Sequence, residues 1–120
     1  MGLDITLYSR NRDTGRDNII GCFRKVNALL NWVHIHVSPV KNNTMIELTE
    51  SHLRLLKENL QQLTPENCHE LYPAVDGFFF GSTDYADMYW YDVADVLSWV
   101  EETLNNPVLH ERTILFSASW

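Results

Sequence analysis

The chain has 120 residues, 45% of them hydrophobic, and a formal net charge of -7 at pH 7. This length and apolar content predict a single compact domain over residues 1–120, and they exclude an intrinsically disordered chain. The acidic balance argues against direct nucleic-acid binding, which normally requires a clustered basic surface. It is typical of a soluble protein, or of one that presents carboxylates to a basic partner.

The N-terminal segment lacks a basic start followed by an apolar core, so no signal peptide is expected. No apolar run is long enough to cross a bilayer. The cysteines, Cys22 and Cys68, and the five histidines fit no metal-ligand spacing, which favours reduced thiols and no bound metal or cofactor. These features predict a cytoplasmic protein without membrane contact.

The first half of the chain predicts a strand, a loop and two helices. Apolar and polar residues alternate over Leu3–Tyr8, which is the period of a half-buried strand. The segment Ser9–Asn18 contains a glycine and no apolar side chain, and it predicts a mobile loop. Apolar residues at helical spacing over Phe23–Val37 predict a helix. Thr49 is a favourable N-cap for a second helix, in which leucines recur at helical spacing.

The second half predicts a short helix, a long helix and a closing strand. Thr64-Pro65 predicts the start of a short helix that ends near Leu71. Ser82, Thr83 and Asp84 compete as N-caps of the long helix, and Thr113–Phe116 is typical of a strand. The expected buried arc of the long helix consists of Tyr85, Tyr89, Val93, Val96, Val100 and Leu104. The elements together predict an α+β fold, with three main helices packed on a small antiparallel sheet that pairs the N- and C-terminal strands.

Three consecutive phenylalanines, Phe78–Phe80, stand between Gly77 and Gly81. One interpretation makes them an aromatic platform for a ligand or a partner. The favoured interpretation places them in the core, because a triplet cannot easily point every ring at solvent.

Five segments follow one another along the chain: Met1–Asp4, Arg24–Asn27 with Trp32, Gly77–Ser82, Asp84–Asp92 and Ser119–Trp120. Their motifs, Met-Gly-Leu-Asp, Arg-Lys-x-Asn, Gly-Phe-Phe-Phe-Gly-Ser, a tyrosine-rich acidic helix and Ser-Trp, resemble those of a family of small bacteriophage and prophage proteins. The resemblance covers nearly the full length. It implies a phage or prophage accessory protein that acts in the cytoplasm of a bacterial host, and it implies no particular activity.

Two positions depart from the family pattern. Leu30 stands where the family usually has a histidine, and Ala86 stands where it commonly has a second acidic residue. These departures argue against carrying an enzymatic role over from relatives. No nucleophile elbow, phosphate loop or paired-acid motif is present either, so no catalytic residue is assigned and a non-enzymatic protein is favoured.

The long acidic helix predicts a protein-binding surface, in which carboxylates imitate the phosphate spacing of nucleic acid and aromatic neighbours supply contact area. We therefore predict a protein that binds and modulates a bacterial protein, in its most concrete form by inhibiting a host defence or nucleic-acid-processing factor. The alternative interpretation is that the acidic face only keeps the protein in solution. The predicted contact residues are Asp84, Asp87, Trp90, Tyr91, Asp95, Trp99 and Glu102.

The runner-up is a small enzyme or ligand-binding domain that uses a cleft between the helix of Arg24 and the helix of Asp84. Arg24 and Lys25 would either hold an acidic ligand or pair internally with Asp84 or Asp92, and internal pairing is favoured. The candidate cleft residues are Arg24, Lys25, Asn27 and Asp92. A third hypothesis is a homo-oligomer that buries exposed aromatic side chains between copies.

Overall fold

The structure, a computed structural model, describes residues 2–76 and 83–120. These residues form a four-stranded antiparallel sheet in the order β2-β1-β4-β3 and three longer helices, α1, α2 and α4. The aromatic turn Gly77–Ser82 lies outside the described residues. The strands are β1 (Asp4–Asn11), β2 (Asp17–Arg24), β3 (Met45–Leu48) and β4 (Arg112–Ser119). The helices are α1 (Asn27–His36), α2 (Glu50–Gln61), α3 (Cys68–Leu71), α4 (Asp87–Leu104) and the 3-10 turn Leu109–Glu111.

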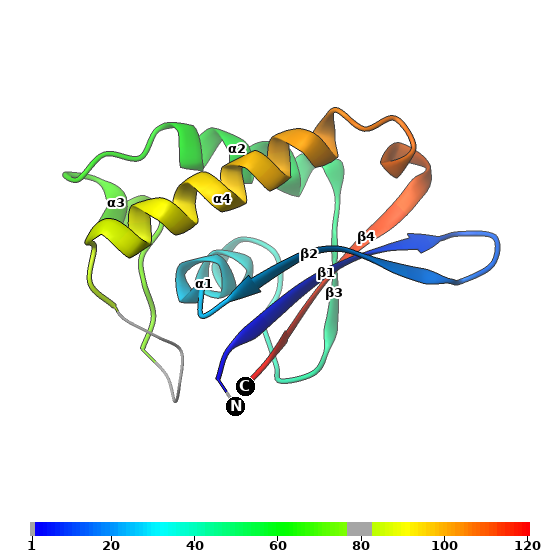
Figure 1. The fold of residues 1–120 in the computed structure, drawn as a ribbon, viewed down its shortest axis with the longest axis horizontal. Helices are drawn as coiled ribbons and strands as arrows, with labels where there is room; N and C mark the ends of the chain where they lie inside the picture. The colour runs from blue at the N-terminus through cyan, green and yellow to red at the C-terminus, as the bar shows by residue number, and fades with distance from the viewer. Residues whose placement is uncertain (1, 77–82) are drawn as a thin grey trace.

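The two ends of the chain meet in the centre of the sheet. β1 pairs antiparallel with β4 over its whole length, from Asp4 opposite Ser119 to Asn11 opposite Arg112. Figure 1 accordingly shows the two termini beside each other at one end of the sheet. The prediction of an α+β fold, with paired terminal strands and three main helices, is confirmed.

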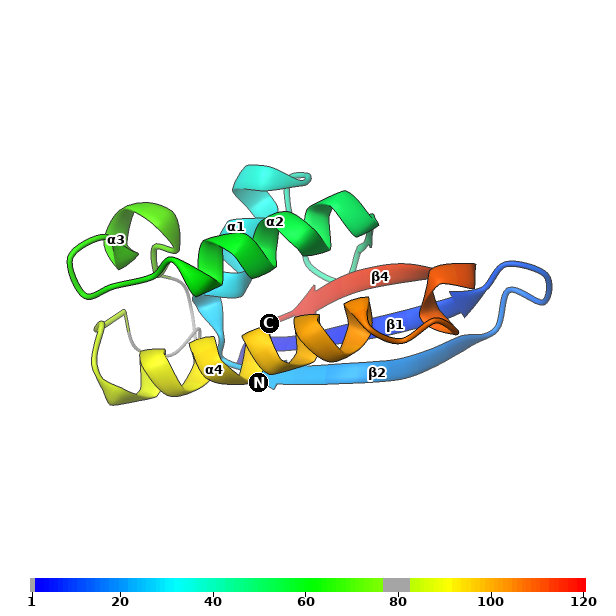
Figure 2. The ribbon, with the colours of Figure 1, turned by 90° about the horizontal axis from the view of Figure 1, so that it is seen from above.

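The core lies between the sheet and the helices. Ile5 and Leu7 of β1 and Phe116 of β4 are buried on one face of the sheet. The helices α2 and α4 lie side by side, as Figures 1 and 2 both show. Their buried apolar residues are Leu53, Leu56, Leu60, Val93, Val96 and Val100. In the part of the chain that the structure describes, no helix is both long and apolar enough to cross a membrane.

The start of α2 agrees with the sequence. The Oγ1 atom of Thr49 accepts a hydrogen bond from the backbone N–H of His52 at 3.3 Å, and Nδ1 of His52 accepts one from the Thr49 N–H at 3.1 Å. This reciprocal pair satisfies two backbone donors that the helix itself leaves unpaired. The predicted N-cap at Thr49 is confirmed.

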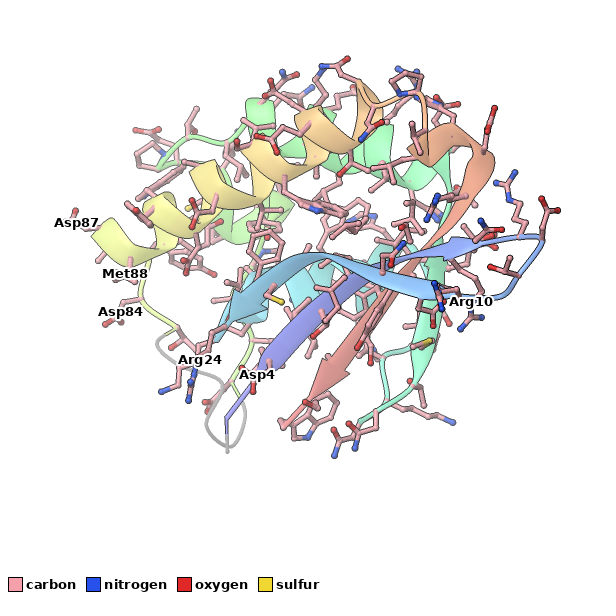
Figure 3. All side chains as sticks on the ribbon, turned by 45° about the vertical axis from the view of Figure 1, so that its right-hand side comes forward. Asp4, Arg10, Arg24, Asp84, Asp87 and Met88 are labelled. Carbon is pink, nitrogen blue, oxygen red and sulfur yellow. The ribbon has the colours of Figure 1, made fainter. Side chains whose placement is uncertain are left out.

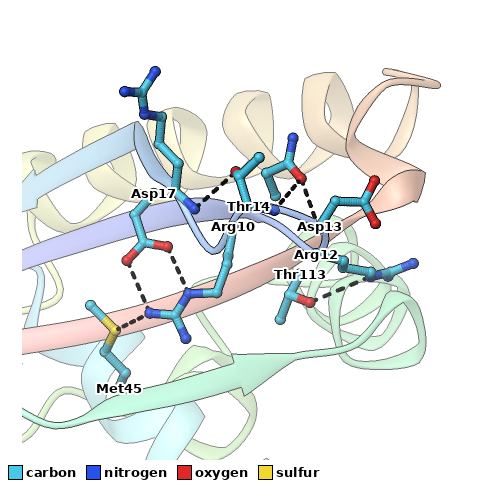
Figure 4. A network of polar contacts seen from close by, with 9 residues as sticks. Arg10, Arg12, Asp13, Thr14, Asp17, Met45 and Thr113 are labelled. Carbon is cyan, nitrogen blue, oxygen red and sulfur yellow. Dashed lines mark hydrogen bonds and ion pairs between the residues drawn. The ribbon is translucent and has the colours of Figure 1, made fainter.

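The loop predicted over Ser9–Asn18 is largely a β-hairpin, so that prediction is wrong at both ends. Nε and Nη2 of Arg10 donate to the two carboxylate oxygens of Asp17 at 2.7 and 3.0 Å, and they join the strands across the ladder (Figure 4). The Asn11 side chain accepts from the backbone of the turn, in which Gly15 takes a φ of 71°. Polar side chains can occupy these strand positions because one face of the hairpin is open to solvent.

The helix predicted from Phe23 begins four residues later, at Asn27. Phe23 and Arg24 belong to β2, where Phe23 lies opposite Ile5 and Arg24 lies opposite Asp4. Lys25 then takes a left-handed φ of 59°, which ends the strand and turns the chain toward α1. The physical reason for the error is that β2 is held by backbone pairing to β1, which a helical apolar period does not reveal.

The long helix also begins later than its polar residues suggest. α4 starts at Asp87, and its N-cap is Ala86, which has no side-chain group to accept a hydrogen bond. Thr83 and Asp84 therefore precede the helix and do not cap it. The sequence also gave no indication of β3, a four-residue edge strand paired with β4.

Candidate functional site

A cleft of about 670 Å³ opens where the chain turns from β2 into α1, facing the first turns of α4. The four candidate cleft residues, Arg24, Lys25, Asn27 and Asp92, all line it. Asp84, Asp87 and Met88 line the α4 side, and Tyr72 lies beneath them. Figure 3 shows Asp84, Asp87 and Met88 at the end of the molecule that also carries Arg24, while Arg10 lies at the far end of the sheet.

Arg24 and Lys25 give the cleft a positive side. Nε of Arg24 lies 4.0 Å from a carboxylate oxygen of Asp4, its partner across the β-ladder, and both side chains are exposed. The predicted pairing of Arg24 with Asp84 or Asp92 is therefore wrong, because Arg24 stands on a strand and faces its cross-strand neighbour. The Lys25 N–H donates to the Leu3 carbonyl at 2.8 Å, which fixes the turn in its left-handed conformation.

Asn27 supports the wall of the cleft. Its side chain is buried, and its Oδ1 accepts a hydrogen bond from the Val75 N–H at 3.0 Å. Nearby, Asn31 donates to the Pro73 carbonyl and the Ala74 N–H donates to the Tyr85 hydroxyl. Side chains from α1 and from the approach to α4 therefore hold residues 73–75 in place, and Asn27 positions the backbone beside the cleft.

Two tyrosines form the floor. The Tyr89 hydroxyl donates to the Tyr72 carbonyl at 2.7 Å, and the two ring centroids are 6.0 Å apart. The Tyr72 side chain is buried, and its own hydroxyl has no hydrogen-bond partner among the described residues. Burial raises the pKa of Tyr72 well above its ordinary value, with smaller contributions from Tyr89 and Asp92. Sequence reasoning missed Tyr72, because a tyrosine before a proline at the end of a short helix belongs to no periodic pattern.

Replacing Tyr72 with phenylalanine is expected to raise the free energy of unfolding by about 1 kcal/mol, because a buried hydroxyl without a partner costs desolvation energy. Replacing Tyr89 with phenylalanine is the matched comparison. It removes a 2.7 Å hydrogen bond and is expected to lower the same free energy by about 1–2 kcal/mol. Urea denaturation measures both values, and equal changes in the two variants would contradict this arrangement of the floor.

Asp92 is the half-buried carboxyl group of the cleft. Burial raises its pKa above the ordinary value of 3.8, and the charge of Asp95 raises it further. The folded protein therefore binds the Asp92 proton more tightly than the unfolded chain does. This contribution to stability is fully present below the unfolded pKa and is lost as the pH rises through the folded pKa.

Asp92→Asn is accordingly expected to raise the free energy of unfolding at neutral pH relative to the parent protein. The difference should shrink as the pH falls below the ordinary carboxyl value of 3.8, where Asp92 is protonated in both states. Denaturant titrations of both proteins across this pH range measure the difference. A loss of stability at neutral pH would show that the ionised carboxylate has a favourable partner in the folded protein.

The outer face of α4 carries most of the predicted contact surface. Asp87, Tyr91, Asp95 and Glu102 are exposed and recur at spacings of four and seven residues, which place them on one side of a helix. Within the described chain, no ion pair reaches the carboxylates of Asp87, Asp95 or Glu102. This side of the helix therefore presents negative charge around an exposed tyrosine.

Three residues of the predicted surface lie elsewhere. Trp99 is buried, and its Nε1 donates to the Ile20 carbonyl at 2.9 Å, so its prediction as a contact residue is wrong. Trp90 is half-buried against Tyr89, and Asp84 lines the cleft ahead of the helix. Trp99 faces β2, a strand that the sequence did not predict, and this is why it was assigned to the surface.

A smaller cavity of about 220 Å³ lies at the opposite end of the molecule, beside the start of α2. His110 places Nδ1 3.5 Å from Glu50 and Nε2 2.9 Å from the Leu104 carbonyl, while Arg54 also contacts Glu50 at 3.0 Å. These contacts connect the 3-10 turn to α2. His110 therefore connects the 3-10 turn to α2 and to the end of α4.

Metal-ligating residue types are spread over the molecule. Among residues 2–76 and 83–120, no group of three or more His, Cys, Asp or Glu side chains is placed to hold a metal ion. The thiols of Cys22, which is exposed, and Cys68, which is buried, are both free. Comparison of the chain with protein-family models, with curated proteins and with solved structures finds no match.

Proposed function

We propose that the chain is a ligand-binding domain, and that the cleft between the β2–α1 turn and α4 is its binding site. The observation that carries the proposal is that polar and charged side chains from separate elements meet at one cleft. Arg24 ends β2, Lys25 follows in the turn, Asn27 begins α1 and Asp92 belongs to α4, yet all four line the same cleft. The volume of about 670 Å³ lies within the range of roughly 300–1,000 Å³ that is common for ligand sites. The proposal assigns binding and no catalytic residue.

A fragment screen observed by NMR tests the proposal. Backbone amide shifts are expected to change around Lys25, Ala28 and Met88, which line the cleft. Shift changes confined to other surfaces, or no binding from a diverse set of fragments, would overturn it.

Two exposed residues of α4 offer a matched pair of variants for this screen. Met88, 68% exposed, lines the cleft, whereas Tyr91, 66% exposed, stands on the outer face. Met88→Arg is expected to abolish fragment binding by placing a long charged side chain across the opening. Tyr91→Arg makes the same change in charge and is expected to leave binding intact.

The second candidate function is that of a phage or prophage accessory protein that binds and modulates a bacterial protein in the host cytoplasm. The phage context rests on the sequence resemblance. The observation that favours protein binding is the outer face of α4, where Asp87 and Asp95 flank Tyr91 and Glu102 follows further along the same side. A basic groove on a nuclease or a regulator would complement that face, because clustered carboxylates compete with nucleic-acid phosphates for the same cations.

A pull-down from bacterial lysate tests this second function. The tagged protein is compared with a variant in which Asp87, Asp95 and Glu102 are changed to the corresponding amides. A near-stoichiometric partner that the variant no longer retains would support the function, whereas equal retention by both proteins would contradict it. Size-exclusion chromatography beforehand distinguishes the 14.0 kDa chain from a homo-oligomer, whose contacts would compete for the same face.

A further inference from the structure

We infer that the cleft takes a small zwitterionic molecule with an apolar body, of the chemical class of free apolar amino acids. The inference rests on the proposed ligand-binding function and names the chemistry of its ligand. It follows from the distribution of charge around the cleft, from the way α1 begins, and from the polar groups of the floor.

The two sides of the cleft carry opposite charges that do not reach each other. Arg24, whose Nε lies 4.0 Å from Asp4, and Lys25 lie on the β2–α1 side, and Asp84, Asp87 and Asp92 lie on the α4 side. Among the described residues, no ion pair within 4.0 Å joins Arg24 or Lys25 to Asp87 or Asp92. A ligand with one charge would approach a like charge on one side, whereas a zwitterion complements both sides.

The start of α1 strengthens the positive side. Its N-cap is Val26, an apolar residue that cannot accept a hydrogen bond through its side chain, and its first turn contains no acidic residue. The N-terminal end of a helix attracts anions, because the positive end of the helix dipole lies there. Val26, Asn27 and Ala28 all line the cleft. A ligand carboxylate beside Lys25 would therefore meet a cation and a helix N-terminus together.

The floor beside Asp92 suits the amine of the ligand. An ammonium group next to the half-buried Asp92 carboxylate offsets the cost of burying that charge. The Tyr72 side chain is buried beneath the same cleft, so the ligand amine would meet Asp92 over an aromatic floor. The tyrosine rings of the floor also favour a cation nearby. Val26, Ala28 and Met88 also line the cleft and provide apolar surface for the body of the ligand.

Four probes that share one apolar body test this inference by NMR titration. L-Phenylalanine carries both charges, N-acetyl-L-phenylalanine only the carboxylate, L-phenylalanine methyl ester only the amine, and N-acetyl-L-phenylalaninamide neither. The zwitterion is expected to bind at least tenfold more tightly than either singly charged probe. Equal or tighter binding of a singly charged or neutral probe would overturn the inference while leaving the ligand-binding function supported.

Two variants test the positive and the negative side of the cleft separately. Lys25→Gln is expected to weaken binding of the carboxylate-bearing probes and leave the methyl ester unchanged, whereas Asp92→Asn is expected to do the reverse. Thermal unfolding confirms that both variants are folded. Absence of binding by all four probes would overturn the inference of a zwitterionic ligand. The fragment screen would then decide separately whether the cleft binds ligands at all. An identical loss for every probe in both variants would also overturn it.

Discussion

Replacing Trp99 with alanine is expected to lower the free energy of unfolding by about 3–5 kcal/mol. The side chain is 9% exposed, its Nε1 donates to the Ile20 carbonyl at 2.9 Å, and its ring makes a T-shaped contact with Phe23 with centroids 6.2 Å apart. The truncation would leave a cavity between α4 and β2 and a carbonyl without its donor. Urea denaturation of the parent and variant proteins measures the loss.

Tyr91→Ala is the matched control, because Tyr91 lies on the same helix and is 66% exposed. Its effect is expected to stay within about 0.5 kcal/mol, as is usual for surface positions without specific partners. Had Trp99 been a surface contact residue, as its sequence position suggested, the two replacements would have similar effects. A mild effect at Trp99 would therefore contradict the packing of α4 on β2.

Elements with a strong apolar period were predictable from sequence. On α4, Tyr89, Val93, Val96 and Val100 recur on one side and are buried, as predicted, whereas Tyr85, predicted for the same arc, precedes the helix and is 39% exposed. On β1, Ile5 and Leu7 alternate with more exposed residues in the same way. Such patterns report which side of an element faces the core, since burial of apolar area is the largest favourable term in folding.

The two edge strands could not be predicted in this way. β2 pairs only with β1 and β3 only with β4, so each has one backbone edge without a partner strand in the described sheet. Ile19 on β2 is 63% exposed, and the strand shows no regular alternation of buried and exposed residues. Pairing of this kind depends on backbone hydrogen bonds to a neighbour, which side-chain periodicity does not encode. The missed β2 accounts for the errors at both Trp99 and Arg24.

The candidate site was likewise only partly predictable from the sequence. Sequence reasoning selected Arg24, Lys25 and Asn27 because polar residues early in an apolar segment require a partner, and it selected Asp92 as a possible partner. The structure places all four at one cleft. The sequence could not identify the groups with which these side chains interact. Asn27 bonds to a backbone group 48 residues away, a contact that only the tertiary fold creates.

Gly21→Ala is expected to lower the free energy of unfolding by about 1–3 kcal/mol, which is the usual cost of forcing extra volume into a packed site. A Cβ atom at this position would lie 2.7 Å from Nε1 of Trp99, closer than van der Waals contact allows. The indole is held by its hydrogen bond to Ile20 and by Phe23, so it cannot move away freely. A glycine replaced by alanine at an uncrowded position would instead gain about 0.4–1 kcal/mol from the unfolded state.

A double-mutant cycle isolates this contact. In a Trp99→Leu background the crowding ring is absent, so Gly21→Ala is expected to cost much less than in the parent protein and to approach the small gain of an uncrowded site. The coupling free energy between the two positions is expected to be about 1 kcal/mol or more, since contacting residues are not additive. Additive effects would show that Trp99 does not cover Gly21. The sign of the alanine effect thus reports whether the indole packs over the edge strand, which is the contact that removes Trp99 from the surface of α4.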